Sequence, residues 1–159
     1  MNREKLVTAL CPGEIQHVGC VVRDLSKSIK HYEEIIGIGP WTTFEFCSSN
    51  CFINGKKSDL HLKAGAVQLT PELTLELIEF VSGESCHKDF LEKHGEGVQH
   101  LGFVTDEYDQ VLKRAEALGI EVLFSAEVEA SSMGHVRAAY LDTYDLVGVI
   151  FEILEIKPF

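Results

Sequence analysis

The pattern of apolar and polar positions along the chain predicts the same order of elements twice. Apolar segments around residues 15–22 and 98–104 have the length and composition of strands. Each is followed by a segment with apolar residues at helical spacing, at residues 25–36 and 108–118, and Gly37 and Gly119 are the expected ends of these helices. Shorter apolar segments, separated by loops that contain Ser, Asn, Gly or Pro, complete each half. The resulting order is β–α–β–β–β, a connector, and β–α–β–β–β.

Two short motifs mark the same places in both halves. Residues 15–19 read Ile-Gln-His-Val-Gly and residues 98–102 read Val-Gln-His-Leu-Gly, so the histidines are offset by 83 residues (100 minus 17). Residues 75–77 read Leu-Glu-Leu and residues 151–153 read Phe-Glu-Ile, so the glutamates are offset by 76 residues (152 minus 76). Such self-similarity indicates repeated folding units. We therefore expect an α+β fold of two tandem βαβββ modules, at residues 14–81 and 97–159, with an N-terminal extension at 1–13 and a polar connector at 82–96.

Four residues in these motifs carry candidate chemistry. His17 and His100 lie in the middle of first strands, and Glu76 and Glu152 lie among apolar neighbours in last strands. A buried, unpaired carboxylate is costly, whereas two neutral imidazoles and two carboxylates balance one divalent cation. Nitrogen and oxygen donors without thiolate suit Zn²⁺, Co²⁺, Ni²⁺, Mn²⁺ or Fe²⁺ with positions open for a substrate. In the alternative interpretation, the glutamates are exposed, the histidines are hydrogen-bonded core residues and the repeat is a folding unit alone.

The composition narrows the class of partner. The net charge is −11, from 14 basic and 25 acidic residues, without a dense Lys/Arg run, which is atypical of proteins that bind nucleic acid or anionic membranes. No apolar segment approaches the length of a membrane span, and the N-terminus lacks a secretory pattern. The five cysteines include no Cys-x-x-Cys pair and suit a reducing compartment. We therefore expect a cytoplasmic protein that acts on a small molecule, with His31, His87 and His94 at its surface.

The motifs at residues 15–19, 24–29, 75–77 and 151–153 resemble those of the vicinal oxygen chelate superfamily. This superfamily includes glyoxalase I, methylmalonyl-CoA epimerase, extradiol dioxygenases, and the fosfomycin and bleomycin resistance proteins. The resemblance extends from about residue 14 to 156, and residues 95–103 are most similar to methylmalonyl-CoA epimerase. It implies paired modules whose curled mixed sheets form a metal-containing cleft, a homodimer, and a substrate such as an acyl thioester or a hemithioacetal. It also implies one divalent ion bound by four residues, which are His17, Glu76, His100 and Glu152.

One segment departs from the epimerase pattern. In that pattern a glutamate-containing segment before the third strand of the first module supplies a catalytic carboxylate, but residues 56–62 here read Lys-Lys-Ser-Asp-Leu-His-Leu. Asp59 or His61 could take its place, and Glu45 is the nearest upstream glutamate. We therefore expect methylmalonyl-CoA to be turned over poorly. In the relatives a loop at the position of residues 131–135 borders the substrate, although this loop could equally be an ordinary turn.

Three functions are compatible with such a site. In the first, the ion stabilises an enolate while Glu152 removes a proton next to a carbonyl, with Glu76 as a second base, as in an epimerase, isomerase or glyoxalase-type lyase. In the second, the ion is Fe²⁺ in a ring-cleaving dioxygenase; that class needs two histidines and one carboxylate, so the fourth ligand Glu76 counts against it. In the third, the cleft traps a small molecule without catalysis. Iron content with oxygen uptake would favour the second function, and a lack of metal the third.

Overall fold

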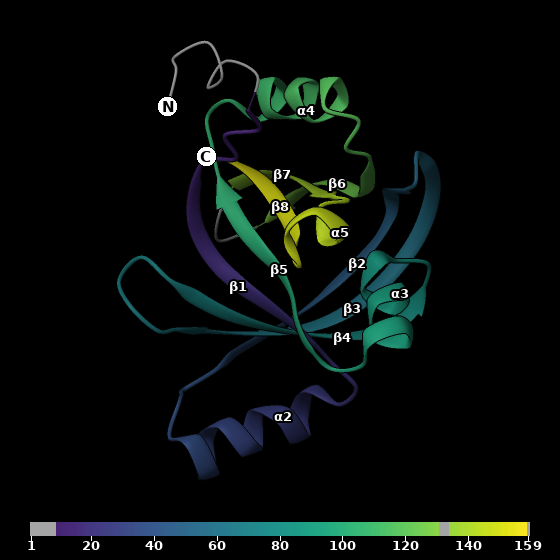
Figure 1. Ribbon diagram of the computed structural model, residues 1–159. Coiled ribbons are helices and arrows are strands. Elements are labelled where there is room, and N and C mark those ends of the chain that lie inside the picture. Colours follow the sequence, from purple (N-terminus) through teal and green to yellow (C-terminus); the bar gives the residue numbers. More distant parts are fainter. Residues whose placement is uncertain (1–8, 131–133, 159) are drawn as a thin grey trace.

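Figure 1 shows the architecture of the computed structural model, which describes residues 9–130 and 134–158. The strands are β1 (Glu14–Val22), β2 (Thr42–Ile53), β3 (Lys56–Gln68), β4 (Thr74–Gly83), β5 (Gly97–Val104), β6 (Val122–Ala130), β7 (Gly134–Leu141) and β8 (Ile150–Lys157). The helices are α2 (Leu25–His31), the π-helical turn η1 (Tyr32–Ile36), α3 (Cys86–His94), α4 (Tyr108–Ala117) and α5 (Tyr144–Val147). None of the helices in these ranges is long and apolar enough to cross a membrane.

The strands close into one barrel, in the order β1-β4-β3-β2-β6-β7-β8-β5. Both halves have the same strand order, because β1, β4, β3 and β2 are neighbours in the same sequence as β5, β8, β7 and β6. The first and last strands of each half are parallel, and the halves meet through the antiparallel pairs β1–β5 and β2–β6. The predicted α+β fold of two βαβββ modules is therefore confirmed, and the two curled sheets join at both seams.

The helix of the first module begins after Asp24 and ends at Gly37, as predicted, but its last turn is of a different helix type. Asp24 caps α2 through its side chain, and Leu25, Ile29 and Tyr32 pack on the outside of the barrel. The last turn is the π-helical η1, in which each turn takes up an extra residue and the apolar stripe loses its register. Ile36, at the end of the predicted stripe, is therefore 61 % exposed.

The connector between the modules contains a helix that the sequence pattern did not predict. Helix α3 follows Ser85, whose hydroxyl oxygen accepts hydrogen bonds from the N–H groups of His87 (2.9 Å) and Lys88 (3.4 Å). It packs against β1, β4 and β5, so this segment contributes to the structure of both modules. The division of the chain into residues 1–13, 14–81, 82–96 and 97–159 stays a prediction.

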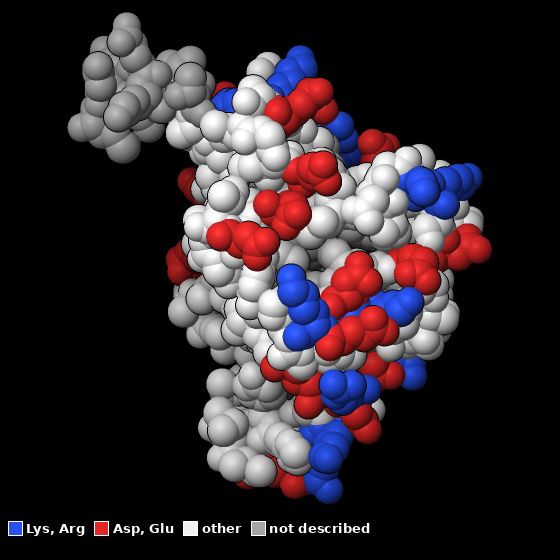
Figure 2. Space-filling view, turned by 45° about the vertical axis from the view of Figure 1, so that its right-hand side comes forward, with Lys and Arg blue, Asp and Glu red and all other residues white. Residues whose placement is uncertain are grey.

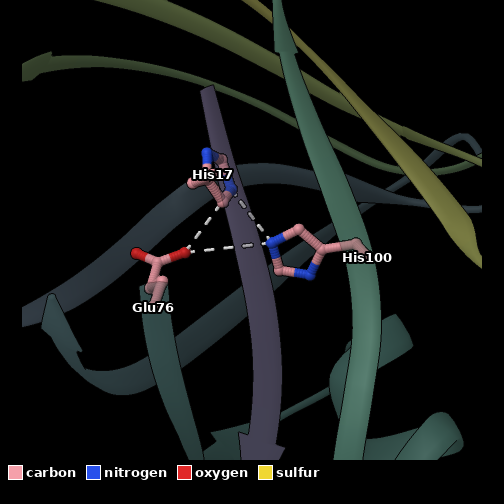
Figure 3. Close-up of side chains that lie close together, drawn as sticks. All are labelled: His17, Glu76 and His100. Carbon is pink, nitrogen blue, oxygen red and sulfur yellow. Dashed lines mark hydrogen bonds and ion pairs between the residues drawn. The ribbon is translucent and has the colours of Figure 1, made fainter. Parts of the chain in front are cut away.

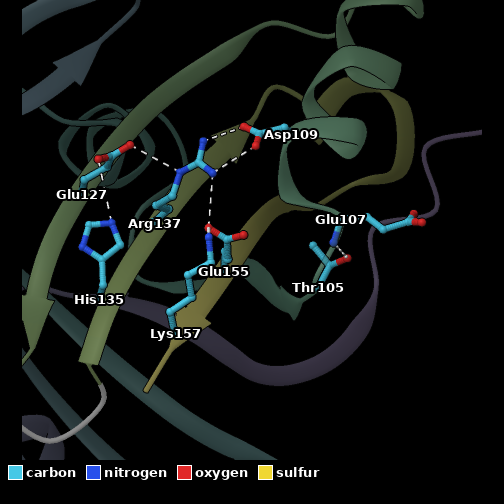
Figure 4. A network of polar contacts seen from close by, with 8 residues as sticks. All are labelled: Thr105, Glu107, Asp109, Glu127, His135, Arg137, Glu155 and Lys157. Atoms are coloured by element: carbon cyan, nitrogen blue, oxygen red, sulfur yellow. Dashed lines mark hydrogen bonds and ion pairs between the residues drawn. The ribbon is translucent and has the colours of Figure 1, made fainter. Parts of the chain in front are cut away.

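The outer face of the second module carries a network of charged side chains (Figure 4). Arg137 on β7 donates to both carboxylate oxygens of Asp109 (2.6 and 3.2 Å) and to Glu155 on β8 (3.2 Å). Its guanidinium also lies over the ring of Tyr108, 4.2 Å from the centroid. Because Asp109 and Tyr108 belong to α4, Arg137 fastens that helix to the sheet. Elsewhere on the surface, Figure 2 shows a face on which basic and acidic side chains are interspersed.

Candidate metal centre

The four side chains predicted as metal ligands come together inside the barrel, at the seam between the modules: His17, Glu76, His100 and Glu152. On the parallel strand pairs, Glu76 is opposite Gly19 and Glu152 is opposite Gly102. Across the β1–β5 seam, His17 is opposite Gly102 and His100 is opposite Gly19. Strand pairing thus brings the histidine and glutamate motifs of both modules together at the β1–β5 seam. Figure 3 shows the rings of His17 and His100 and the carboxylate of Glu76 facing one another.

Both carboxylates lie close to the same two imidazole nitrogens, and His17, Glu76 and His100 form a group whose ligating atoms are all near one another. The Nε2 atoms of His17 and His100 are 3.1 Å apart. Oε2 of Glu152 lies 2.8 Å from Nε2 of His17 and 3.5 Å from Nε2 of His100. Oε2 of Glu76 lies 3.7 and 3.8 Å from the same two nitrogens. His100 is 0 % and Glu152 5 % exposed, so the cluster lies in the interior.

The glycine of each histidine motif makes room for the histidine of the other module. A Cβ atom at Gly19 would lie 1.9 Å from Cε1 of His100, and a Cβ atom at Gly102 would lie 2.0 Å from Cε1 of His17. Neither glycine has a positive φ, so the reason for glycine is space rather than backbone conformation. The repeated Gln-His-apolar-Gly motif therefore encodes the reciprocal packing of two imidazole rings.

The glutamine that precedes each histidine orients its ring. Nδ1 of His17 donates to Oε1 of Gln16 (2.7 Å), and Nδ1 of His100 donates to Oε1 of Gln99 (3.0 Å). The Gln99 amide also donates to the carbonyl oxygen of Cys86 (3.0 Å), which ties His100 to the first residue of α3. When both rings are neutral, with the protons on Nδ1, their Nε2 lone pairs face each other and the carboxylates. Such a second hydrogen bond is typical of metal-binding histidines.

The electrostatics of the cluster favour a cation. Burial opposes a charge on His17, but the carboxylates of Glu152 and Glu76 outweigh it and raise the pKa of His17 to about 9. Burial raises the pKa of Glu76 to about 7, although His17 opposes this shift. Burial, with His17 nearby, lowers the pKa of His100 well below its usual range. A proton and a metal ion would therefore compete for the same atoms of this cluster.

One buried oxygen is left over in this arrangement. Oε2 of Glu152 makes no well-directed hydrogen bond to any residue in the described ranges, even though Nε2 of His17 is 2.8 Å away. A divalent ion would satisfy this oxygen together with both Nε2 lone pairs. The donor set therefore fits a divalent metal, and the ligand roles of these residues stay a prediction.

A large, mainly apolar cavity lies beside the cluster. Its volume is about 880 Å³, and its wall includes His17, Glu76 and Glu152. The larger apolar side chains of the wall are Phe44, Phe46, Leu62, Val67, Ile78, Phe124, Val128, Val136, Leu154 and Ile156. His87 and Tyr140 are the other titratable side chains among the described residues that line it. A cavity of this size and character accommodates a small molecule.

The residues considered as replacements for the epimerase carboxylate lie outside this cavity. Asp59 and His61 do not line it, and His61 instead contacts Glu45 on the neighbouring strand, with 2.7 Å between Nε2 and Oε2. Because strand residues alternate between faces, the inward positions of β2 and β3 are mainly apolar, such as Phe44 and Leu62, and none of them carries a charge. Neither Asp59 nor His61 is placed to act on a substrate here. Residues 131–133 of the loop expected to border the substrate lie outside the described residues.

Sequence reasoning missed four side chains of this site: Gln16, Gln99, His87 and Tyr140. The glutamines are part of the repeated motif, but their role depends on which ring nitrogen of each histidine faces the other predicted ligands. The prediction that His87 lies at the surface was wrong, because it is 1 % exposed. His87 is in α3, which has no counterpart in the repeat, so no pattern signalled it. A signal was available only in Ser85, a residue typical of helix N-caps.

Comparison with known families gives the assignment. The family model described as the Glyoxalase/Bleomycin resistance protein/Dioxygenase superfamily matches residues 16–140. The chain belongs to this superfamily. The resemblance inferred from the histidine and glutamate motifs is thereby confirmed.

Solved structures of the same fold include two epimerases. Methylmalonyl-CoA epimerase from Mycobacterium tuberculosis has 20 % identity and a TM-score of 0.64, with 91 % of this chain and 89 % of that chain covered. A variant of the Streptomyces coelicolor enzyme, in complex with 2-nitronate-propionyl-CoA, has 23 % identity and a TM-score of 0.60, with 90 % and 96 % covered. A 4-hydroxymandelate synthase mutant from Streptomyces coelicolor has 16 % identity and a TM-score of 0.63, with 91 % of this chain and 49 % of that chain covered. At these identities the likeness is one of fold.

Proposed function

We propose that this chain is a divalent-metal-dependent isomerase or lyase that removes a proton next to a carbonyl group. The observation that carries the proposal is the convergence of two imidazole nitrogens and two carboxylates in the wall of an apolar cavity. Two histidines and one carboxylate suffice to hold an ion in an open site. A second carboxylate beside the same two imidazole nitrogens is therefore available to act as a base. This feature favours proton-transfer chemistry over the dioxygenase and the non-catalytic alternatives.

The residues of the chain would divide the work between binding and proton transfer. His17 and His100, oriented by their glutamines, and Glu76 would hold Zn²⁺, Co²⁺, Ni²⁺ or Mn²⁺. When bound, such an ion would polarise a substrate carbonyl and stabilise the charge that develops on its oxygen. Glu152, as a fourth and loosely held ligand, would accept the proton from the adjacent carbon. Burial, with the carboxylate of Glu152 close by, raises the pKa of Tyr140 well above its usual range, so its phenol keeps its proton beside that base.

The second carboxylate decides between two kinds of product. If Glu76 also exchanges protons, the substrate can be deprotonated on one side and reprotonated on the other, which is the requirement of an epimerase. If Glu76 serves as a ligand alone, the site has one base and suits a glyoxalase-type reaction. The burial that raises the pKa of Glu76 to about 7 would allow it to exchange a proton near neutral pH.

The substrate class follows from the cavity and from the relatives. Its apolar wall suits the acyl part of a thioester or of a hemithioacetal, and an epimerase of the same fold binds 2-nitronate-propionyl-CoA. No inward position of β2 or β3 among the cavity-lining residues carries a third carboxylate. We therefore expect methylmalonyl-CoA to be turned over poorly. The homodimer and the cytoplasmic location stay predictions.

The test combines metal analysis with proton exchange. Freshly purified protein is analysed for metal and then incubated in D₂O with methylmalonyl-CoA or with the hemithioacetal of methylglyoxal and glutathione. We expect a stoichiometric divalent metal and exchange of the proton next to the carbonyl in at least one substrate. Glu152→Gln keeps an oxygen ligand and should retain metal while losing about 10²- to 10⁴-fold in rate. Glu45→Gln, on the outer face, is the matched control and should behave as the wild type.

Four outcomes would count against the proposal. Full activity of the metal-loaded Glu152→Gln variant would remove the proton-transfer role of Glu152. Stoichiometric metal in alanine variants of all four ligands would show that the metal site is elsewhere. Iron with oxygen uptake would indicate a dioxygenase, and purified protein that neither contains nor binds a divalent metal would indicate a non-catalytic binding protein.

A further inference from the structure

His87 is a buried histidine beside the cavity that the proposed proton transfer does not use. It occupies the first turn of α3, is 1 % exposed and forms part of the cavity wall. Its ring lies 6.2 Å from the ring of His100 and 5.1 Å from the ring of Tyr140, measured between centroids. Phe124 lies on another side, at 6.2 Å. His87 is thus next to the metal centre without being one of the predicted ligands.

The hydrogen bonds of Ser85 determine which nitrogen of His87 carries the proton. The hydroxyl oxygen of Ser85 already accepts from two backbone N–H groups, at His87 (2.9 Å) and Lys88 (3.4 Å). Its own proton is therefore free to be donated, and Nδ1 of His87 lies 2.9 Å away. Nδ1 acts as the acceptor, so in the neutral ring the proton is on Nε2. The helix cap consequently presents His87 as an N–H donor.

Nε2 of His87 has no hydrogen-bond partner among the residues that the structure describes. An unpaired buried donor costs stability, and native proteins rarely retain one without a use. The ring of His87 has the rings of Phe124, Tyr140 and His100 as neighbours and also borders the cavity. An acceptor for its Nε2–H group can therefore come from the cavity. Ser85 is only 1 % exposed, and its hydrogen bond to Nδ1 holds the imidazole of His87 in place.

We propose that Nε2–H of His87 donates a hydrogen bond to an oxygen of the substrate, and that this oxygen is distinct from the one at the metal centre. The proposal rests on the function proposed above. It specifies the substrate class further: a molecule with two acceptor oxygens, one bound at the His17–His100 cluster and a carbonyl or carboxylate oxygen at His87. The thioester or acid group next to the reacting carbon would supply the second oxygen. His87 would then be a catalytic residue that fixes the orientation of the acidic carbon toward Glu152.

Binding of small acids to the zinc-loaded protein tests this without turnover. Malonate offers two carboxylates and propionate one, so their dissociation constants are measured by calorimetry for the wild type and for His87→Leu, His87→Gln and Phe124→Leu. We expect His87→Leu to weaken malonate binding by about 10- to 100-fold, the usual effect of losing a hydrogen bond to a charged group. Propionate affinity should change little. His87→Gln, whose amide nitrogen can replace Nε2, should retain most of the malonate affinity, and Phe124→Leu controls for a changed wall.

A second measurement covers the case in which His87→Leu does not fold. Nitrogen-15 NMR of the wild-type imidazoles identifies the protonated nitrogen, and we expect Nε2–H at His87 and a shift of this signal when malonate is added. A proton on Nδ1 in the neutral ring, or no shift on saturation with malonate, would overturn the proposal. Equal malonate affinity in metal-loaded wild type and His87→Leu would do the same. Loss of proton transfer in all substrates with intact His87-dependent malonate binding would instead overturn the proposed function alone.

Discussion

Replacing Gly102 by alanine tests the packing of the two imidazole rings directly. The new Cβ atom would lie 2.0 Å from Cε1 of His17, whereas real Cβ atoms essentially never come closer than 3.0 Å, so the ring must move by about 1 Å (3.0 minus 2.0). Nδ1 of His17 is held by Gln16 at 2.7 Å, which opposes that movement. Metal–ligand distances tolerate only about 0.2 Å. Since disturbing the residues around a metal ligand already costs about 10- to 100-fold in affinity, we expect at least about 100-fold here.

The variant should still fold. His17 borders the cavity, so its ring can turn into open space, and overpacking of this kind costs about 1–3 kcal/mol in the free energy of unfolding. Zinc affinity by competition with a chelator dye, and thermal unfolding of the metal-free protein, are measured together. Gly65→Ala is the control: its Cβ would meet Cδ1 of Ile29 at 3.0 Å, the end of a flexible side chain away from the ligands. Wild-type zinc affinity in folded Gly102→Ala would refute the reciprocal packing as a requirement for the metal site.

Three further predictions concern the same protein. The His17→Ala and His100→Ala variants should lose metal and activity together. Metal content and turnover are measured on the same preparation, and activity without metal would contradict the prediction. Metal affinity should rise with pH up to about 9, because metal binding must displace protons from the cluster. Binding displaces about two protons below the pKa of Glu76 at about 7, about one between this value and the pKa of His17 at about 9, and none above it. A metal affinity that does not change with pH below 9 would exclude this competition. Arg137→Met should lower the free energy of unfolding by about 1–2 kcal/mol, less at high salt, and leave metal affinity unchanged, since its partners lie on the outer face.

The repeat predicted the fold class because each copy carries enough pattern to define its own strands. The parallel pairing of first and last strands could not be read from the motifs, since pairing depends on which strand edges meet. Closure through β2 and β6 rests on three residue pairs, of which Cys51 and Ala126 are one. Neither residue belongs to a motif. The π-helical turn was equally hidden, because residues 32–36 keep an apolar and polar composition that also suits an ordinary helix.

The candidate site was predictable to the extent that it is duplicated. Each ligand position recurs in both modules, and a costly buried carboxylate that occurs twice indicates a shared cause. The glycines were part of the same motif, but their role required the register between β1 and β5, which places Gly19 opposite His100. Asp59 and His61 were considered for their chemistry alone, and strand alternation puts them on the outer face. The chemistry of a side chain was therefore not enough to predict its role, because the register of its strand decides which face it occupies.

The duplication accounts for the predicted metal centre but not for a preference among substrates. Ligands and orienting glutamines recur in both halves, whereas a substrate with one acidic carbon has no such symmetry. Contacts that distinguish its two ends must come from places where the halves differ, and α3 is such a place. It contacts the second half through Gln99, which bonds the carbonyl oxygen of Cys86, while the corresponding Gln16 instead lines the cavity. It also brings His87 to the wall. Changes in α3 should therefore alter which molecule is bound, while changes in the motifs alter whether a metal is bound at all.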